Sequence, residues 1–213
     1  MKIVLFGDSI TDACRHRDTD EYTGALGCGY AFFIGGELKE SSPQNYEILN
    51  RGISGNRIVD LYARIKADVW NLQPDVLSIL IGINDIWHEL SSKNGVDIER
   101  FEKVYRMLIE DTLVRLPKLK IMLCEPYVLH GVATDEKWEE FNKVRDYAKV
   151  VKNLANEYGL YFVPTQAALE EKAEMFGAEH YADDGVHPTP AGARVIANEW
   201  LKVFKEQIDK KYK

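Results

Sequence analysis

The run Val-Leu-Ser-Ile-Leu-Ile at residues 76–81 limits the possible folds of this chain more than any other stretch. All of its residues except Ser78 are apolar, so both faces of a strand formed here must be covered by other parts of the protein. Strands of this kind occur in parallel sheets that lie between two layers of helices. We therefore expect residues 76–81 to form the central strand of such a sheet.

Segments with the patterns of strands and helices alternate along the rest of the chain. Further strands are predicted at residues 2–6, 46–50, 120–124 and 161–164. Helices are predicted at about residues 30–39, 57–70, 97–116, 138–158, 167–175 and 190–207. This order predicts an α/β fold with three layers, in which a five-stranded parallel sheet lies between helices. A length of 213 residues suits one such domain, so residues 1–213 are expected to form a single domain.

Charge and cysteine usage restrict the partners and the location of the protein. The net charge of -7 argues against a surface for nucleic acid. Residues 1–6 are too short for a signal peptide or a membrane span, so we expect no membrane partner and a cytoplasmic location. Cys14, Cys28 and Cys124 are an odd number at wide spacing, which favours reduced thiols. No catalytic role is expected for Cys14, because most cysteines are small packing residues.

A Gly-Asp-Ser turn at residues 7–9 directly follows the first predicted strand. It places Ser9 at the carboxyl end of that strand, where open α/β sheets bind their ligands. Ser9 is therefore a candidate nucleophile, and its neighbour Asp8 is a candidate substrate-binding residue. The alternative is an ordinary turn, because glycine, aspartate and serine are all frequent turn residues.

A serine nucleophile needs a base to accept its proton and a carboxylate to orient that base. Asp184 and His187 meet this requirement, because they lie three residues apart across a glycine turn. Pro188 disfavours helical geometry at His187, which places the imidazole on an extended loop. The residues alone leave two alternatives open, a surface turn before a helix and a metal site formed by His180, Asp183, Asp184 and His187.

Acyl transfer also needs donors directed at the oxyanion that develops on the substrate. Gly52 follows a short strand, and its missing side chain lets the backbone N–H approach a ligand. Asn84 follows the apolar run of residues 76–81 and offers a side-chain amide. The alternatives are a turn position for Gly52 and a helix cap for Asn84.

Aromatic side chains follow two of the predicted strand ends. Trp87 comes shortly after Asn84, and Tyr127 comes shortly after the strand at residues 120–124. Loops at strand ends collect binding residues, so both are candidate walls for stacking on a sugar ring, with packing as the alternative. Glu125 is expected to make a loop salt bridge or hydrogen bond rather than to act as a catalytic acid.

Blocks that carry these candidates occur in a fixed order at residues 7–12, 50–55, 82–85 and 184–188. The order of Ser, Gly, Asn and Asp-x-x-His resembles the SGNH hydrolases, the GDSL esterase and lipase family, over nearly the whole chain. The resemblance implies a flavodoxin-like strand order 2-1-3-4-5 and a catalytic triad of Ser9, His187 and Asp184. It also implies an oxyanion hole formed by the N–H groups of Ser9 and Gly52 and the side chain of Asn84.

Two longer blocks resemble one subgroup of this family. Residues 24–30 and 50–87 are similar to the intracellular bacterial acetylxylan esterases. That similarity implies removal of acetyl groups from xylo-oligosaccharides, with no metal or other cofactor and with a homo-oligomeric assembly. These esterases usually carry an aromatic residue just before the catalytic aspartate, where this chain has Asp183. A second carboxylate at this position is expected to shift the pH profile.

Other functions remain as alternatives. A lipase or thioesterase would act on longer acyl chains, which a small acyl pocket rejects sterically. A phosphotransferase of the haloacid-dehalogenase type requires Asp-x-Asp after its first strand, but Ile10 stands where the second acid is needed. A non-catalytic carbohydrate-binding protein would keep the aromatic cleft without needing Ser9, Asp184 and His187 together.

Overall fold

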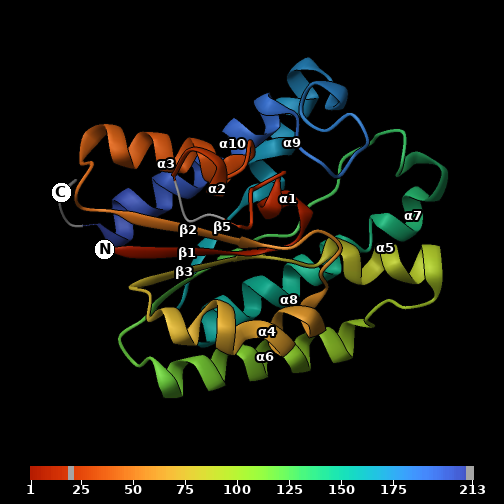
Figure 1. Ribbon diagram of the computed structural model, residues 1–213. Coiled ribbons are helices and arrows are strands. Elements are labelled where there is room, and N and C mark those ends of the chain that lie inside the picture. Colours follow the sequence, from red (N-terminus) through yellow and green to blue (C-terminus); the bar gives the residue numbers. More distant parts are fainter. Residues whose placement is uncertain (19–21, 210–213) are drawn as a thin grey trace.

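A computed structural model describes residues 1–18 and 22–209 of the chain. Its strands are β1 (Lys2–Gly7), β2 (Glu47–Gly52), β3 (Val76–Leu80), β4 (Lys120–Cys124) and β5 (Tyr161–Val163). They form one sheet in the order β2-β1-β3-β4-β5, and every neighbouring pair is parallel (Figure 1). The predicted strand order is therefore confirmed, with the apolar run after residue 75 in the central strand β3.

Helices cover both faces of this sheet (Figure 1). The longer ones are α3 (Tyr30–Ser41), α4 (Ile58–Asp68), α6 (Ile98–Arg115), α8 (Val144–Glu157), α9 (Thr165–Phe176) and α10 (Pro190–Val203). One layer contains α3, α9 and α10, in which α10 packs against the other two. The opposite layer contains α4, α6 and α8, in which α6 packs against the other two. The three-layer prediction is thus confirmed.

Shorter elements connect these layers. They are α1 (Ser9–Asp12), α2 (Tyr22–Ala25), α5 (Ile83–Ser92), α7 (Trp138–Phe141), the 3-10 turns η1 (Trp70–Leu72), η2 (Asp135–Lys137) and η3 (Ala178–His180), and the π-helical turn η4 (Phe204–Ile208). Figure 1 shows α1, α5 and α7 at the end of the sheet toward which β1 and β3 run. In the part of the chain that the structure describes, no helix has the length and apolarity needed to cross a membrane.

Helices α5 and α7 differ from the sequence prediction. Helix α5 is not among the predicted helices and was considered only in the alternative that made Asn84 a helix cap. It begins after Gly82, before Asn84, without a side-chain cap, so the usual start signal is missing. The helix predicted at residues 138–158 is divided into α7 and α8. Phe141 at the end of α7 packs edge-on against Trp87 of α5, with ring centroids 5.5 Å apart. This contact directs α7 toward α5 instead of along the axis of α8.

The register of the sheet brings neighbouring strand ends to one edge. Gly7 of β1 pairs with Gly52 of β2 on one side and with Leu80 of β3 on the other. Leu80 pairs in turn with Cys124 of β4. The segments that follow these residues therefore leave the sheet side by side. They carry Ser9, the turn after β2 and the first turn of α5.

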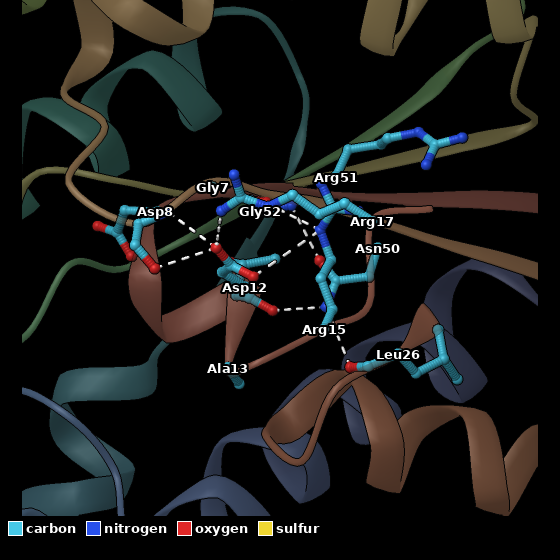
Figure 2. A network of polar contacts seen from close by, with 12 residues as sticks. Gly7, Asp8, Asp12, Ala13, Arg15, Arg17, Leu26, Asn50, Arg51 and Gly52 are labelled. Carbon is cyan, nitrogen blue, oxygen red and sulfur yellow. Dashed lines mark hydrogen bonds and ion pairs between the residues drawn. The ribbon is translucent and has the colours of Figure 1, made fainter. Parts of the chain in front are cut away.

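Asn50 joins the first two of these segments. Its Nδ2 donates hydrogen bonds to the carbonyl oxygens of Thr11 and Leu26, at 2.6 Å and 3.0 Å. Its Oδ1 accepts a hydrogen bond from the Gly52 N–H at 2.9 Å (Figure 2). Gly52 also lies so close to α1 that a Cβ added there would be 2.2 Å from the Asp12 nitrogen. The end of β2 is therefore in direct contact with the backbone of α1.

Ser78, the polar residue of β3, is fully buried between layers. Its Oγ accepts a hydrogen bond from Nε1 of Trp200 at 2.9 Å and lies 3.4 Å from Sγ of Cys124. These contacts connect β3 to α10 and to β4, so the hydroxyl is accommodated without access to water.

We expect Gly52→Ala to lower the free energy of unfolding by about 1–3 kcal/mol or more, because its methyl group would meet backbone atoms of α1. Gly36→Ala in α3 is the matched control, since an added Cβ there meets nothing within 4 Å. The control should raise the free energy of unfolding by about 0.5–1 kcal/mol, because alanine favours a helix over glycine. Urea titrations measure both changes. A Gly52→Ala variant as stable as the natural chain would contradict this packing.

Candidate active site

Ser9 is the first residue of α1 and directly follows β1 and Asp8. The side chain of Asp8 accepts a hydrogen bond from the Ile10 N–H at 3.0 Å and so caps the short helix. This cap fixes the turn from which the Ser9 side chain projects. The Oγ atom of Ser9 lies 2.9 Å from Nε2 of His187.

Asp184 holds the opposite side of the His187 ring. Oδ2 of Asp184 lies 2.6 Å from Nδ1 of His187. Its other oxygen, Oδ1, accepts hydrogen bonds from the N–H groups of Val186 and His187 at 2.8 Å and 2.7 Å. Gly185 turns the chain between them with a φ of 90°, a conformation that glycine adopts readily. Ser9, His187 and Asp184, predicted from distant parts of the sequence, thus form one hydrogen-bonded line.

Hydrogen bonds shift the pKa values of both His187 and Asp184. The bond from Asp184 raises the pKa of His187 above its usual 6.5, although partial burial acts in the opposite direction. Burial tends to raise the pKa of Asp184, but the hydrogen bonds from His187 and from the two N–H groups lower it overall. Asp184 is therefore an anion that stabilises a protonated imidazole. In its neutral form, His187 is able to accept the proton of the Ser9 hydroxyl at Nε2, and Asp184 then stabilises the imidazolium that results.

A loop that follows β4 packs against the backbone beside Asp184. The Leu129 N–H donates a hydrogen bond to the Gly185 carbonyl at 2.8 Å, and the Val132 N–H donates one to the Asp183 carbonyl at 3.2 Å. The side chain of Asp183 is exposed. Main-chain contacts therefore fix the loop that carries His187.

Asn84 lies in the first turn of α5 and is only 6% exposed. Its Nδ2 donates a hydrogen bond to the Asn56 carbonyl at 3.1 Å. The next residue, Asp85, accepts a hydrogen bond from the Ile58 N–H at 3.1 Å. Two adjacent side chains of α5 therefore hold the segment after β2 and place Asn84 at the same edge of the sheet as Ser9.

Gly52 does not occupy the predicted role of an oxyanion donor. Its N–H donates to Oδ1 of Asn50 and is thus already used within the fold. Gly55 lies three residues further on, in a left-handed conformation with a φ of 82°. The residue after it, Asn56, is the one that contacts Asn84. Within residues 1–18 and 22–209, no protein acceptor bonds to the Gly55 N–H.

Asp12 links the end of α1 to the same segment. Its Oδ2 accepts hydrogen bonds from the N–H and the hydroxyl of Ser54, each at 3.0 Å, and it pairs with Arg17 (Figure 2). Nε of Arg15 donates to the Gly52 carbonyl at 2.9 Å. Sequence reasoning did not single out Asp12, although it belongs to the block of residues 7–12 that carries Ser9.

Comparison with known proteins adds an independent observation. The model of the GDSL-like lipase/acylhydrolase family matches residues 5–195. The chain belongs to this family. An acetylxylan esterase from Geobacillus stearothermophilus is 36% identical over 208 residues, which cover 94% of this chain and 92% of the esterase. The crystal structure of an acetylxylan esterase from Geobacillus stearothermophilus superposes on this chain with a TM-score of 0.86 and 36% sequence identity. The match covers 95% of this chain and 93% of that esterase.

A second solved structure shares the fold of this GDSL hydrolase. It is an alpha/beta hydrolase enzyme from the metagenome of Lake Arreo in Spain, with a TM-score of 0.86 and 30% identity. The match covers 95% of this chain and 94% of that enzyme. The resemblance found in the sequence is confirmed, and the protein is a carboxylic ester hydrolase.

The two aromatic residues predicted to line the cleft of this hydrolase have different positions. Trp87 is partly exposed, and its ring centroid lies 5.9 Å from that of His187. Tyr127 is fully buried, and its hydroxyl donates to the Val186 carbonyl at 2.7 Å. The prediction that Tyr127 stacks on a sugar ring is therefore wrong. Its aromatic ring fills the interior, and its hydroxyl supports the loop of His187.

The alternative metal site is not assembled in this hydrolase. Among the described residues, no group of three or more His, Cys, Asp or Glu side chains is arranged to hold a metal ion. Asp184 is bonded to His187, whereas His180 lies 3.8 Å from Glu179.

Glu125 has a structural role at the end of β4. Its Oε2 accepts a hydrogen bond from the N–H of Gln166 at 3.1 Å, near the start of α9. This confirms the prediction of a loop hydrogen bond for Glu125.

Asp8 is fully buried, which excludes its predicted contact with substrate. Burial raises the pKa of its carboxyl from 3.8 to about 7, although the hydrogen bond from Ile10 acts to lower it. Its Oδ2 has no hydrogen-bond partner among the described residues. Asp8 is therefore a buried cap whose negative charge destabilises the folded state near neutral pH.

We expect the stability of the natural protein, relative to an Asp8→Asn variant, to fall as the pH rises from 3.8 to about 7. Over this range the folded protein keeps the Asp8 proton and the unfolded chain loses it. Each pH unit then lowers the free energy of unfolding by up to about 1.4 kcal/mol. Asparagine preserves the cap and does not ionise. Urea titrations of both proteins across the range measure the difference, and parallel pH curves would refute the prediction.

Proposed function

We propose that this GDSL hydrolase is a serine esterase that removes acetyl groups from carbohydrates such as acetylated xylo-oligosaccharides. The observation that carries the proposal is the hydrogen-bonded line from Ser9 through His187 to Asp184. The identity of 36% to an acetylxylan esterase, over 94% of this chain, supports the choice of substrate. The proposed partner is thus a small acetylated sugar, and the proposed chemistry is acyl transfer to water.

In the proposed mechanism, Oγ of Ser9 attacks the ester carbonyl carbon while Nε2 of His187 accepts its proton. Asp184 orients the ring through Nδ1 and stabilises the imidazolium that forms. The imidazolium then protonates the sugar oxygen as the ester C–O bond breaks. The deacetylated sugar departs, and the acetyl group remains bound to Oγ of Ser9. A water molecule attacks this acyl-enzyme with His187 again as the base. Acetate departs, and Ser9 regains its proton.

We propose that the N–H groups of Ser9 and Gly55 and the amide of Asn84 bind the oxyanion. The Nδ2 of Asn84 carries two hydrogens, and the Asn56 carbonyl requires only one of them. Gly55 takes the place predicted for Gly52, because the Gly52 N–H is already bonded to Asn50. Donors held in this way stabilise charge that develops only during the reaction.

Trp87 is the proposed wall for the sugar ring. Its edge-on contact with Phe141 restrains the plane of the indole, and the 5.9 Å separation of its ring centroid from that of His187 supports a role beside the ester. Asp183 lies exposed on the same loop as His187. Its carboxylate adds to the rise in the pKa of His187, after the larger effects of Asp184 and Asp8.

We also propose that residues 1–213 act as one domain within a cytoplasmic homo-oligomer. Ser9, Asn84 and the turn after β2 come from one sheet, which supports a single functional unit. Met175 and Phe176 at the end of α9 are 60% and 59% exposed, and a second copy would cover this apolar surface. The free cysteines are consistent with a reducing compartment. Sedimentation analysis of the purified protein measures the assembly.

We expect the protein to release acetate from acetylated xylo-oligosaccharides and from p-nitrophenyl acetate. Ser9→Ala should lower both activities by about 10⁴-fold or more, because no other group forms the acyl-enzyme. A series of p-nitrophenyl esters should show activity that falls steeply as the acyl chain lengthens, since a small pocket rejects added methylenes. Acetate assays and release of p-nitrophenol provide the measurements.

The outcomes of this experiment separate the alternatives. Serine-dependent release from the synthetic ester alone would retain the esterase mechanism and exclude the sugar substrate. Undiminished activity beyond about eight acyl carbons would favour a lipase or thioesterase. Binding of the oligosaccharide without acetate release from either ester would identify a non-catalytic carbohydrate-binding protein.

We expect Asn84→Ala to lower kcat by about 10²–10³-fold, because one oxyanion donor is lost. Asn153→Ala is the control, since Asn153 is exposed on α8 and should tolerate the change without loss of activity. Steady-state kinetics on p-nitrophenyl acetate compare the two variants. A loss below about tenfold in Asn84→Ala would remove Asn84 from the oxyanion hole.

A further inference from the structure

Two exposed cysteines lie together beyond the end of α1. Cys14 and Cys28 are free and exposed, whereas Cys124 is free and buried in β4. The Cys28 thiol lies 3.3 Å from the carbonyl oxygen of Ala13, the residue that directly precedes Cys14. The proposed esterase mechanism uses neither of them.

Backbone contacts hold this thiol pair in place. The N–H of Cys28 donates a hydrogen bond to the Ala13 carbonyl at 2.8 Å, and the Cys28 thiol donates to the same oxygen at 3.3 Å. Ala13 and Cys14 both adopt left-handed conformations, with φ of 41° and 60°. This turn directs the chain after α1 toward the segment that carries Cys28.

Glycines on both sides of Cys28 allow the close approach. A Cβ added at Gly27 would lie 2.4 Å from the Ala13 carbonyl oxygen, and one added at Gly29 would lie 2.6 Å from the Ala13 Cβ. Larger residues at these two positions would therefore push the segments apart. Gly27 and Gly29 thus allow Cys28 to contact Ala13, the residue that directly precedes Cys14.

We propose that Cys14 and Cys28 form a thiol–disulfide exchange site whose co-substrate is a low-molecular-weight disulfide of the glutathione class. In the first step, the thiolate of Cys14 attacks one sulfur of oxidised glutathione. The S–S bond of glutathione breaks, and one reduced glutathione leaves as a thiolate that takes up a proton. In the second step, the Cys28 sulfur loses its proton and attacks the Cys14 sulfur, and the second glutathione leaves. Two protein thiols are oxidised, and one glutathione disulfide is reduced to two thiols.

The surroundings of Cys28 fit its role in the second step. Partial burial, together with the neighbouring Cys14, raises the pKa of the Cys28 thiol, which disfavours attack on a disulfide free in solution. Attack on a mixed disulfide at Cys14 is intramolecular, and proximity compensates for the low fraction of thiolate. Cys124 is excluded from exchange, because burial raises its pKa to about 12 and keeps the oxidant away.

The exchange site adjoins the segments that build the catalytic edge. Cys14 follows the helix that begins with Ser9, and Cys28 lies two residues after Leu26, whose carbonyl accepts a hydrogen bond from Asn50. A Cys14–Cys28 disulfide would therefore cross-link chain segments next to α1 in response to the redox state of the medium. The proposal does not depend on which ester the protein hydrolyses.

The test is incubation of the full-length protein with glutathione buffers of increasing oxidised fraction, followed by acid quenching, alkylation and intact-mass measurement. We expect a species that has lost two hydrogen atoms, carries no glutathione and shows a Cys14–Cys28 linkage in peptide maps. Alkylation without denaturant should modify two thiols in the reduced protein and none in the oxidised protein. Cys124 should react only after unfolding, in both forms.

Cys14→Ser and Cys28→Ser serve as matched variants. Cys28→Ser should stop at a stable glutathione adduct of Cys14, whereas Cys14→Ser should form an adduct at Cys28 much more slowly, because Cys28 is a poor attacker of a free disulfide. Thermal unfolding adds a second readout, because the cross-link should raise the midpoint in the natural chain and leave it unchanged in the double variant. Glutathione adducts that persist on the natural chain, disulfide-linked dimers, or unchanged alkylation at all buffer ratios would each overturn the proposal.

Discussion

The buried side chain of Asn50 connects the parts of this protein on which the catalytic edge depends. One amide bonds to α1, to the segment before α3 and to the end of its own strand. A buried amide is costly to leave without partners, so these segments are stable mainly when all three contacts form together. The parallel register of β1 and β2 then determines where the Ser9 turn stands relative to the turn of Gly55.

Two carboxyl groups on either side of this edge show how burial and hydrogen bonding act in opposite directions. Asp184 receives hydrogen bonds at both oxygens, and its pKa is lowered. Asp8 is buried with one oxygen left without a partner, and its pKa is raised to about 7. The same residue type therefore provides an anion beside His187 and, next to Ser9, a cap that keeps its proton up to about pH 7.

Sequence patterns predicted the fold because the apolar run of β3 and the helix-length connections leave few other arrangements. They also predicted the line of Ser9, His187 and Asp184, since these residue types carry recognisable chemistry. Burial was harder to predict, because an aromatic such as Tyr127 after a strand suits a core as well as a cleft. The choice between Gly52 and Gly55 depended on a side-chain hydrogen bond that spacing alone does not reveal. The start of helix α5 was misplaced, because it lacks a capping side chain and Asn84, the alternative cap, lies inside the helix.

At position 183, in the loop that carries His187, the backbone and the side chain have different roles. The backbone carbonyl of Asp183 holds the loop, because it accepts a hydrogen bond from the Val132 N–H. Any amino acid at this position would provide the same carbonyl. The side chain points to solvent and holds no part of the loop in place. An aromatic ring in place of the charge here would therefore leave the hydrogen bonds of Asp184 undisturbed. A change of side chain at position 183 therefore alters the surface beside His187 and leaves the reacting groups in place.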